Sequence, residues 1–147
     1  MNILLIFLWI YLAMIATSFW EAYVEGRFPW HHRKVGWKIK IFGNYWLTGY
    51  HFCLFFVMWP LLLSLPLIIY GWDTKLFGVL ASAYFSGAVL EDFCWFLVNP
   101  EIKFLQDFNP QFVDYFPWLK IKRFQIPLTY LLGVVVAFLF WVLLWRG

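Results

Sequence analysis

The sequence predicts an all-α fold in which a four-transmembrane-helix bundle carries an interfacial aromatic segment between its third and fourth helices. Hydrophobic residues fill 64% of the 147 positions and charged residues only 13%, whereas soluble domains are about half apolar and a quarter charged. Four apolar runs reach the roughly 20 residues that a helix needs to cross a bilayer. At this length we expect a single integral membrane domain over residues 1–147.

We expect the spanning helices over residues 3–23, 45–70, 75–98 and 126–145. The first run lacks the basic start of a signal peptide, and it is longer than the apolar region of a signal peptide. We therefore interpret it as a retained helix. Pro60 and Pro66 predict a kink in the second helix. Residues 71–74 form a short turn, and Pro127 suits the first turn of the fourth helix.

The segment before the fourth helix, residues 101–125, mixes several phenylalanines and Trp118 with charged residues and prolines. This composition predicts a short amphipathic or re-entrant piece that lies at the membrane interface. The fourth helix itself has only Thr129 and Tyr130 as polar residues in its body. We therefore interpret that helix mainly as scaffold.

Two adjacent acids, Glu91 and Asp92, lie inside the otherwise apolar third helix. A charge in hydrocarbon costs at least ~2.5–3.5 kcal/mol on insertion scales, so such a residue indicates a functional site. Consecutive residues of a helix project about 100° apart. We therefore expect Glu91 to join a polar cluster, and Asp92 to work with Asn99 at the end of the helix.

Two other helix ends offer partners for Glu91. Glu21 and Glu25 are four residues apart in the first helix, and Thr48 and His51 are three apart in the second, so each pair shares a helix face. Four buried acids could not all stay ionised in one place. The sequence therefore predicts a bound cation or protonated carboxyls, unless Glu21 and Glu25 are simply solvated at the interface.

The distribution of basic residues predicts the orientation in the membrane. Lysine and arginine concentrate in residues 26–44 and 101–125. The positive-inside rule therefore places both long loops in the cytoplasm and both termini outside, most simply in the plasma membrane of a prokaryote. The polar ends of the first three helices then meet in one cavity on the cytoplasmic side, with Glu91 and Asp92 about 10 Å inside the boundary.

The residue types in this cavity are those of a metal site. Carboxylates with one imidazole suit Mn, Fe or Zn better than Cu, and helix bundles build metal centres from facing helices. A b-type haem is disfavoured because His51 has no second axial histidine near it, and the His31–His32 pair of the first loop is interpreted as solvated. The predicted metal ligands are Glu21, Glu25, His51 and Glu91, with Asp92, Asn99 and Thr48 as supporting polar residues.

Small residues also indicate how the third helix packs. Gly78, Ser82 and Ser86 recur at four-residue spacing, and such stripes let membrane helices approach closely. The helix is therefore central, or it contacts a second copy or a membrane-complex partner. The lipid bilayer is the expected environment, and nucleic acid is not an expected partner, because basic residues mixed with aromatics are typical of the headgroup layer. Cys53 and Cys94 are interpreted as packed side chains.

Three ordered strings resemble motifs of a group of small four-helix membrane proteins from bacteria and archaea. They are Trp20–Gly26 (WEAYVEG), Leu47–His51 (LTGYH) and Glu91–Pro100 (EDFCWFLVNP). The resemblance spans most of the chain and implies the same four helices and polar positions, without implying an activity. The group also tends to carry a histidine before its fourth helix, where this chain has Tyr115–Lys120 (YFPWLK). If that histidine is a ligand in the group, this chain lacks it.

Three functions remain open at this point. The first is metal-dependent chemistry on a lipid or lipid-linked substrate. The second is proton-coupled transport by an oligomer, because buried acids and a histidine are typical parts of proton paths. The third is an accessory or assembly subunit, in which Glu91 and Asp92 pair with partner residues or with Arg27, Arg33 or Lys38 of the first loop. The sequence does not decide whether the protein is an enzyme.

Overall fold

The computed structural model describes residues 2–28, 35–121 and 124–147. Within these ranges, four helices are long and apolar enough to cross a membrane: Ile3–Glu25, Gly49–Tyr70, Thr74–Val98 and Leu128–Arg146. The described part is mostly helical, and its strands form two small hairpins. An all-α class therefore fits the structure, and the four apolar helices are compatible with a membrane protein.

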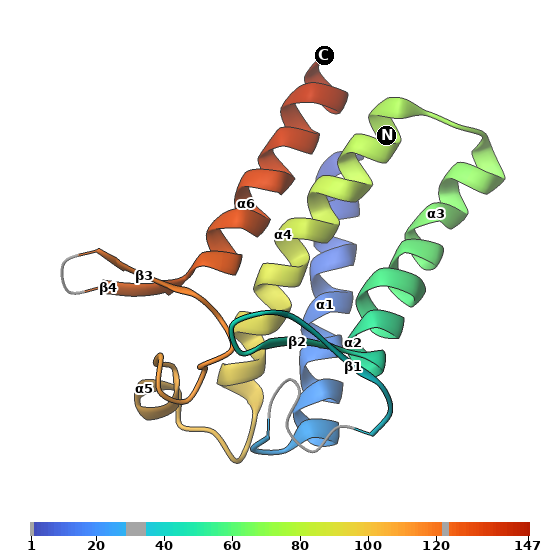
Figure 1. The fold of residues 1–147 in the computed structure, drawn as a ribbon. Coiled ribbons are helices and arrows are strands. Elements are labelled where there is room, and N and C mark those ends of the chain that lie inside the picture. Colours follow the sequence, from blue (N-terminus) through green and yellow to red (C-terminus); the bar gives the residue numbers. More distant parts are fainter. Residues whose placement is uncertain (1, 29–34, 122–123) are drawn as a thin grey trace.

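Helix α4 (Thr74–Val98) is the centre of the bundle. It packs against α1 (Ile3–Glu25) and α6 (Leu128–Phe140), which continues as the π-helical segment η2 (Trp141–Arg146), as Figure 1 shows. Asp73 begins α4, because its Oδ1 accepts hydrogen bonds from the backbone N–H groups of Lys75 at 2.8 Å and Leu76 at 3.0 Å. Both chain ends lie at one end of the bundle and both hairpins at the other (Figure 1); which end faces the cytoplasm stays a prediction.

The second span is built from three pieces, α2 (Gly49–His51), the π-helical η1 (Phe52–Met58) and α3 (Trp59–Tyr70). The backbone N–H of Trp59 bonds to the carbonyl of Leu54, so the next carbonyl, that of Phe55, would bond to residue 60 in the same register. Pro60 has no N–H to offer. The hydroxyl of Tyr84 on α4 donates to the Phe55 carbonyl instead, which satisfies the group that the proline leaves open.

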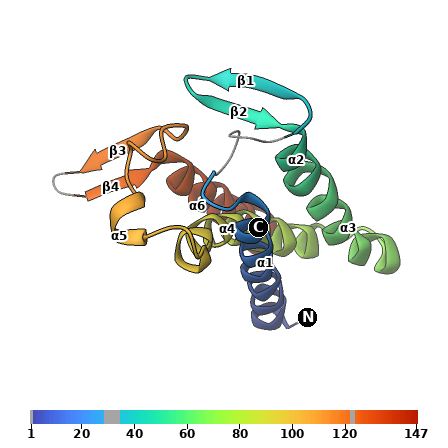
Figure 2. The same cartoon turned by 90° about the horizontal axis from the view of Figure 1, so that it is seen from below.

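The second span begins later than the sequence predicts, at Gly49 instead of Tyr45. Residues Tyr45–Thr48 form strand β2, which pairs antiparallel with β1 (Lys38–Phe42) through a turn at Gly43 (φ 47°). The alternation in KIKIF and the Gly-Asn step after it are hairpin signals. The aromatic residues before His51 therefore belong to a strand, and Figure 2 shows this hairpin beside the start of α2.

The segment between α4 and α6 also differs from the expected amphipathic piece. It contains a single-turn helix, α5 (Phe104–Asp107), and a hairpin of β3 (Trp118–Ile121) and β4 (Phe124–Pro127). Pro127 ends β4, so α6 begins at Leu128, two residues later than predicted. The aromatic residues of the segment pack on the lower end of α4, in a buried cluster of Ala22, Trp95, Phe96, Ile102, Val113, Tyr115 and Phe116.

The small-residue stripe of α4 is used inside the molecule. Gly78 faces η2, where an added Cβ would lie 2.7 Å from the Cβ of Leu144. Ser86 accepts a hydrogen bond from the hydroxyl of Tyr11 on α1 at 2.8 Å, and Ser82 is buried. The interpretation of α4 as a central helix is therefore the one that the structure supports. Gly78 and Ser86 already contact η2 and α1, and a contact of this stripe with a second copy or a partner stays a prediction.

Candidate functional site

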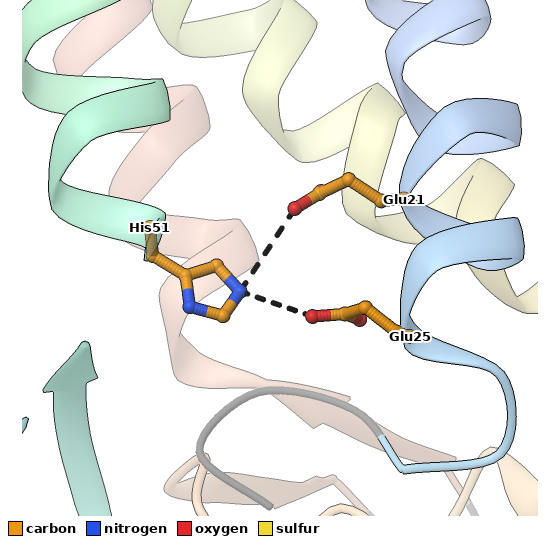
Figure 3. Close-up of side chains that lie close together, drawn as sticks. All are labelled: Glu21, Glu25 and His51. Carbon is orange, nitrogen blue, oxygen red and sulfur yellow. Dashed lines mark ion pairs between the residues drawn. The ribbon is translucent and has the colours of Figure 1, made fainter. Parts of the chain in front are cut away.

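Two carboxylates and one imidazole meet where α1 and α2 face each other (Figure 3). Glu21 and Glu25 lie one turn apart at the end of α1, and His51 ends α2. The His51 Nε2 is 3.4 Å from the Glu25 Oε1 and 3.9 Å from the Glu21 Oε1. Glu21 is 4% exposed and His51 is 2% exposed, so this charge-bearing group lies out of contact with bulk water.

These three side chains could hold a metal ion. One donor atom from each lies within 4.8 Å of the others. Two donors that bind one ion at about 2.1 Å are at most about 4.2 Å apart, and both His51 distances, 3.4 and 3.9 Å, are within that limit. The bound of 4.8 Å on the Glu21–Glu25 pair exceeds this limit, so binding one ion would require the carboxylates to rotate toward each other.

Thr48 fixes the orientation of the imidazole. Its Oγ1 lies 2.7 Å from the His51 Nδ1 and accepts a hydrogen bond from the His51 backbone N–H at 3.3 Å. Because Thr48 ends β2 and caps α2, the hairpin positions the histidine. A partner on Nδ1 leaves Nε2 directed at the carboxylates, which is how a hydrogen bond to the second ring nitrogen orients a metal-binding histidine.

A second set of contacts fixes the end of α1 beside Glu25. The Asn99 amide donates to the carbonyl of Gly26 at 2.8 Å, and the carboxylate of Glu101 accepts from the backbone N–H of Arg27 at 3.1 Å. The Arg27 guanidinium bonds to the Asp107 carboxylate at 2.9 Å. We call these contacts the α1 clamp. They hold the end of α1 to the loop after α4.

The α1 clamp corrects two expectations from the sequence. Asn99 bonds to Gly26 and to the backbone N–H of Glu101, and the Asp92 carboxylate instead accepts from the hydroxyl of Tyr130 on α6. Arg27 pairs with Asp107 and not with either acid of α4. Asp107 was not singled out in the sequence, because its role depends on the fold of the loop that follows α4.

The two adjacent acids of α4 face different helices, as their 100° separation predicts. Glu91 is 3% exposed and lies within hydrogen-bonding reach of Glu21 on α1, whereas Asp92 bonds to α6. Among the described residues, the Oε1 of Glu91 has no hydrogen-bond partner. Glu91 is therefore next to the three-residue cluster without being one of the three that meet most closely.

The cluster lines one wall of a cavity of about 370 Å³. Five of the seven predicted polar residues line this cavity, whereas Thr48 and Asn99 do not. Aromatic residues that the sequence did not single out line it too: the lining includes Glu21, Glu25, His51, Glu91, Asp92, Tyr45, Tyr84, Trp95, Tyr115, Thr129 and Tyr130. The interpretation of α6 as scaffold is thus incomplete, because both of its polar residues line the cavity. Tyr84 could have been found from its spacing, since it lies two turns before Glu91.

Tyrosines of the two loops add hydroxyl groups to the cavity wall. Burial raises the pKa of Tyr45 to about 12, and the nearby Asp92 contributes to the shift. Burial likewise raises the pKa of Tyr115 well above its ordinary value. Both hydroxyls therefore stay protonated at neutral pH and can donate hydrogen bonds. Tyr115 belongs to the aromatic segment that precedes the fourth helix.

Other predicted features fall outside the site or outside the described residues. The His31–His32 pair and Arg33 lie in residues 29–34, which the structure does not describe. Cys53 is exposed and Cys94 is half-buried, and both are free thiols. No protein-family model matches the chain, and no curated protein or solved structure matches it either.

The α1 clamp gives a prediction about pH. The Lys103 backbone N–H donates to the Asp107 carboxylate at 2.8 Å and, with Arg27, lowers the pKa of Asp107. Because the pKa of Asp107 is lower in the folded state, its ionised carboxylate stabilises the fold at pH values above the ordinary aspartate pKa of about 3.9. This stabilisation is lost as the pH falls through the pKa of the folded state. We expect Asp107→Asn to cost about 1–2 kcal/mol at pH 7. Arg27 is 46% exposed, so its ion pair adds little to this.

Thermal unfolding in detergent from pH 7 to pH 3 checks this prediction. The difference between wild type and Asp107→Asn should shrink as the pH falls below about 4. Asp114→Asn is the matched control, because Asp114 is exposed and bonds only to the side chain of Asn44 in the described structure. Equal stability of all three proteins at pH 7 would show that the clamp does not stabilise α1.

Proposed function

We propose that this protein is an integral membrane enzyme in which Glu21, Glu25 and His51 hold a divalent metal ion, Mn, Fe or Zn, that acts on a lipid or lipid-linked substrate. The observation that carries the proposal is the meeting of two carboxylates and an imidazole, with donor atoms within 4.8 Å of one another, on the wall of a cavity. A divalent cation would offset the negative charge of these buried carboxylates.

The donor set favours this range of metals. Carboxylate oxygens with one imidazole nitrogen suit Mn, Fe and Zn, and neither Cys53 nor Cys94 belongs to the cluster. When bound in such a site, the ion supplies Lewis-acid activation of water or of a substrate oxygen. Three protein ligands leave positions for water and substrate, as in catalytic metal sites.

Residues beyond the three ligands have distinct tasks in this proposal. Thr48 holds the imidazole so that Nε2 points at the ion. Glu91, next to Glu21, can hold or release a proton beside the ion. Asp92 and Tyr130 form a second hydrogen-bonded pair on the cavity wall, where they can hold the substrate or exchange a proton with it.

The surroundings of the site support a lipid as the substrate. The cavity is lined by residues of all four apolar helices, and most of its lining side chains are aromatic or aliphatic. A water-soluble substrate would have to cross this apolar lining, whereas a lipid reaches it from the bilayer. The predicted orientation puts the site near the cytoplasmic boundary, at the depth of lipid head groups.

Metal analysis of the purified protein tests the proposal. Wild type is expected to bind about one Mn, Fe or Zn per chain after dialysis against each metal, and the double variant Glu21→Gln/Glu25→Gln is expected to bind none. Lipids extracted from nanodiscs should show a metal-dependent change in mass with wild type only. Equal, background metal in both proteins would reject the proposal.

One observation favours a second candidate, a proton relay. Glu21 and Glu91 are both buried and interact with each other beside His51, and buried acids next to a histidine are typical parts of proton paths. A metal-free protein with a proton flux in liposomes that Glu91→Gln abolishes would favour this function. A metal-free protein without flux that co-purifies with fixed partners would favour the accessory-subunit function.

A further inference from the structure

A groove extends into the depth of the bundle from the cluster of Glu21, Glu25 and His51, which we call the metal cluster after its proposed role. The cavity at the cluster is open on one side, and a second hollow of about 300 Å³ lies farther along α4. Pro60, Tyr84 and Phe85 line both, so the two hollows adjoin each other. Residues of α3, α4 and α6 line the two hollows, which together form a groove along α4. Helices α3 and α6 lie on opposite sides of α4 in Figure 1.

The composition of the groove changes along its length. The end at the cluster carries the carboxylates, His51 and tyrosine hydroxyls. The far end is lined by apolar side chains apart from Tyr84 and the hydroxyl of Ser64, which bonds to its own helix at the carbonyl of Leu61. A groove that is polar at one end and apolar at the other fits an amphipathic molecule in one orientation only.

The polar end also contains buried donors that no described residue satisfies. Among the described residues, the Nε1–H of Trp95 and the hydroxyl of Thr129 have no hydrogen-bond partner, although both residues line the cavity and Trp95 is 4% exposed. A buried donor without a partner destabilises the protein, because it has lost its hydrogen bond to water. A ligand that brings acceptor oxygens to this end would offset this destabilisation.

We infer that the groove binds a single lipid chain, with an oxygen-rich head group at the metal cluster and the hydrocarbon chain along α4 toward Phe77 and Phe140. The flanking helices are long enough to span the membrane, so the apolar end lies in hydrocarbon, where lipid chains are the available apolar ligand. The head group is a phosphate or ester whose oxygens accept from Trp95 and Thr129. Only the placement of the head group rests on the proposed metal function.

Blocking the apolar end tests the chain site separately from the metal. Ser64→Trp places a large ring in the groove, whereas Leu65→Trp, at the next position of the same helix, places it on the outer face, where Leu65 is 48% exposed and does not line the groove. Leu67→Trp is a second blocking variant from another lining position. Each protein is purified from cells and from nanodiscs of phosphatidylethanolamine and phosphatidylglycerol, and bound lipid is counted by native mass spectrometry.

Wild type and Leu65→Trp are expected to retain one lipid per chain, and the two blocking variants at least about tenfold less, with unchanged metal content. The mass of the lipid retained from cells distinguishes a glycerophospholipid from an isoprenoid lipid. Equal lipid retention in all four proteins, or none in wild type, overturns the chain site even if metal binds. Lipid retention with this variant pattern but without metal supports the chain site and overturns the proposed enzyme function.

Discussion

His51→Ala is expected to lower the affinity for the divalent metal at least about 100-fold, which corresponds to about 2.7 kcal/mol. The variant removes the only imidazole of the cluster and leaves Glu21 and Glu25, whose donor atoms lie on one side of the His51 Nε2. Losing a direct ligand should exceed the 10–100-fold cost of losing an outer-shell partner. Metal titration followed by calorimetry measures the change.

Thermal stability gives a second readout for the same variant. A ligand that binds only the folded state stabilises it, by about 2.7 kcal/mol when its concentration is 100 times the dissociation constant. Metal should therefore raise the unfolding midpoint of wild type and leave that of His51→Ala almost unchanged. His31→Ala and His32→Ala are the controls, because they remove the other two histidines of the chain. A metal-induced rise that survives in His51→Ala would place the ion elsewhere.

Thr48→Val is expected to weaken metal binding by about 10–100-fold without removing a ligand. The substitution deletes the hydroxyl 2.7 Å from the His51 Nδ1 and keeps a side chain of similar shape at a fully buried position. The imidazole then loses the contact that directs its Nε2 toward Glu21 and Glu25. The same hydroxyl caps α2, so the metal-free variant should also lose about 1 kcal/mol of stability.

The Thr48→Ser variant separates the effect of the Thr48 hydroxyl on metal affinity from the effect of its methyl group. It keeps the hydrogen bonds to the imidazole and to the backbone of His51, so its metal affinity should stay close to that of wild type. If the valine variant bound metal as tightly as the serine variant, Thr48 would serve only as the helix cap. A weaker affinity in both variants would instead point to packing around the methyl group.

The sequence alone determined the helices and the polar residues of the site. Composition and run length were sufficient to predict four helices long and apolar enough to span a membrane, because a lipid environment requires long apolar segments whatever their tertiary contacts. The helical period alone was enough to separate the directions of Glu91 and Asp92, which the structure shows as contacts with α1 and α6. The polar side chains were found for the same reason, since charge inside an apolar helix is costly.

Only the tertiary structure decided which polar groups touch. Asn99 and Arg27 found partners in Gly26 and Asp107, because the loop after α4 folds back onto the end of α1, and no local pattern specifies such a long-range contact. The stripe of Gly78 and Ser86 was ambiguous between an internal and an external contact, since a close-packing surface has the same sequence in both cases.

At the start of the second span, apolar composition alone predicts the wrong secondary structure. Residues Tyr45–Thr48 suit a membrane helix by composition, yet they pair with β1, because backbone pairing in a hairpin competes with helix formation in an aromatic segment. That choice decided the candidate site, since it ends the strand at Thr48 and turns the imidazole of His51 toward Glu21 and Glu25. The sequence therefore determined which residues are present at the site, and tertiary pairing determined how they face one another.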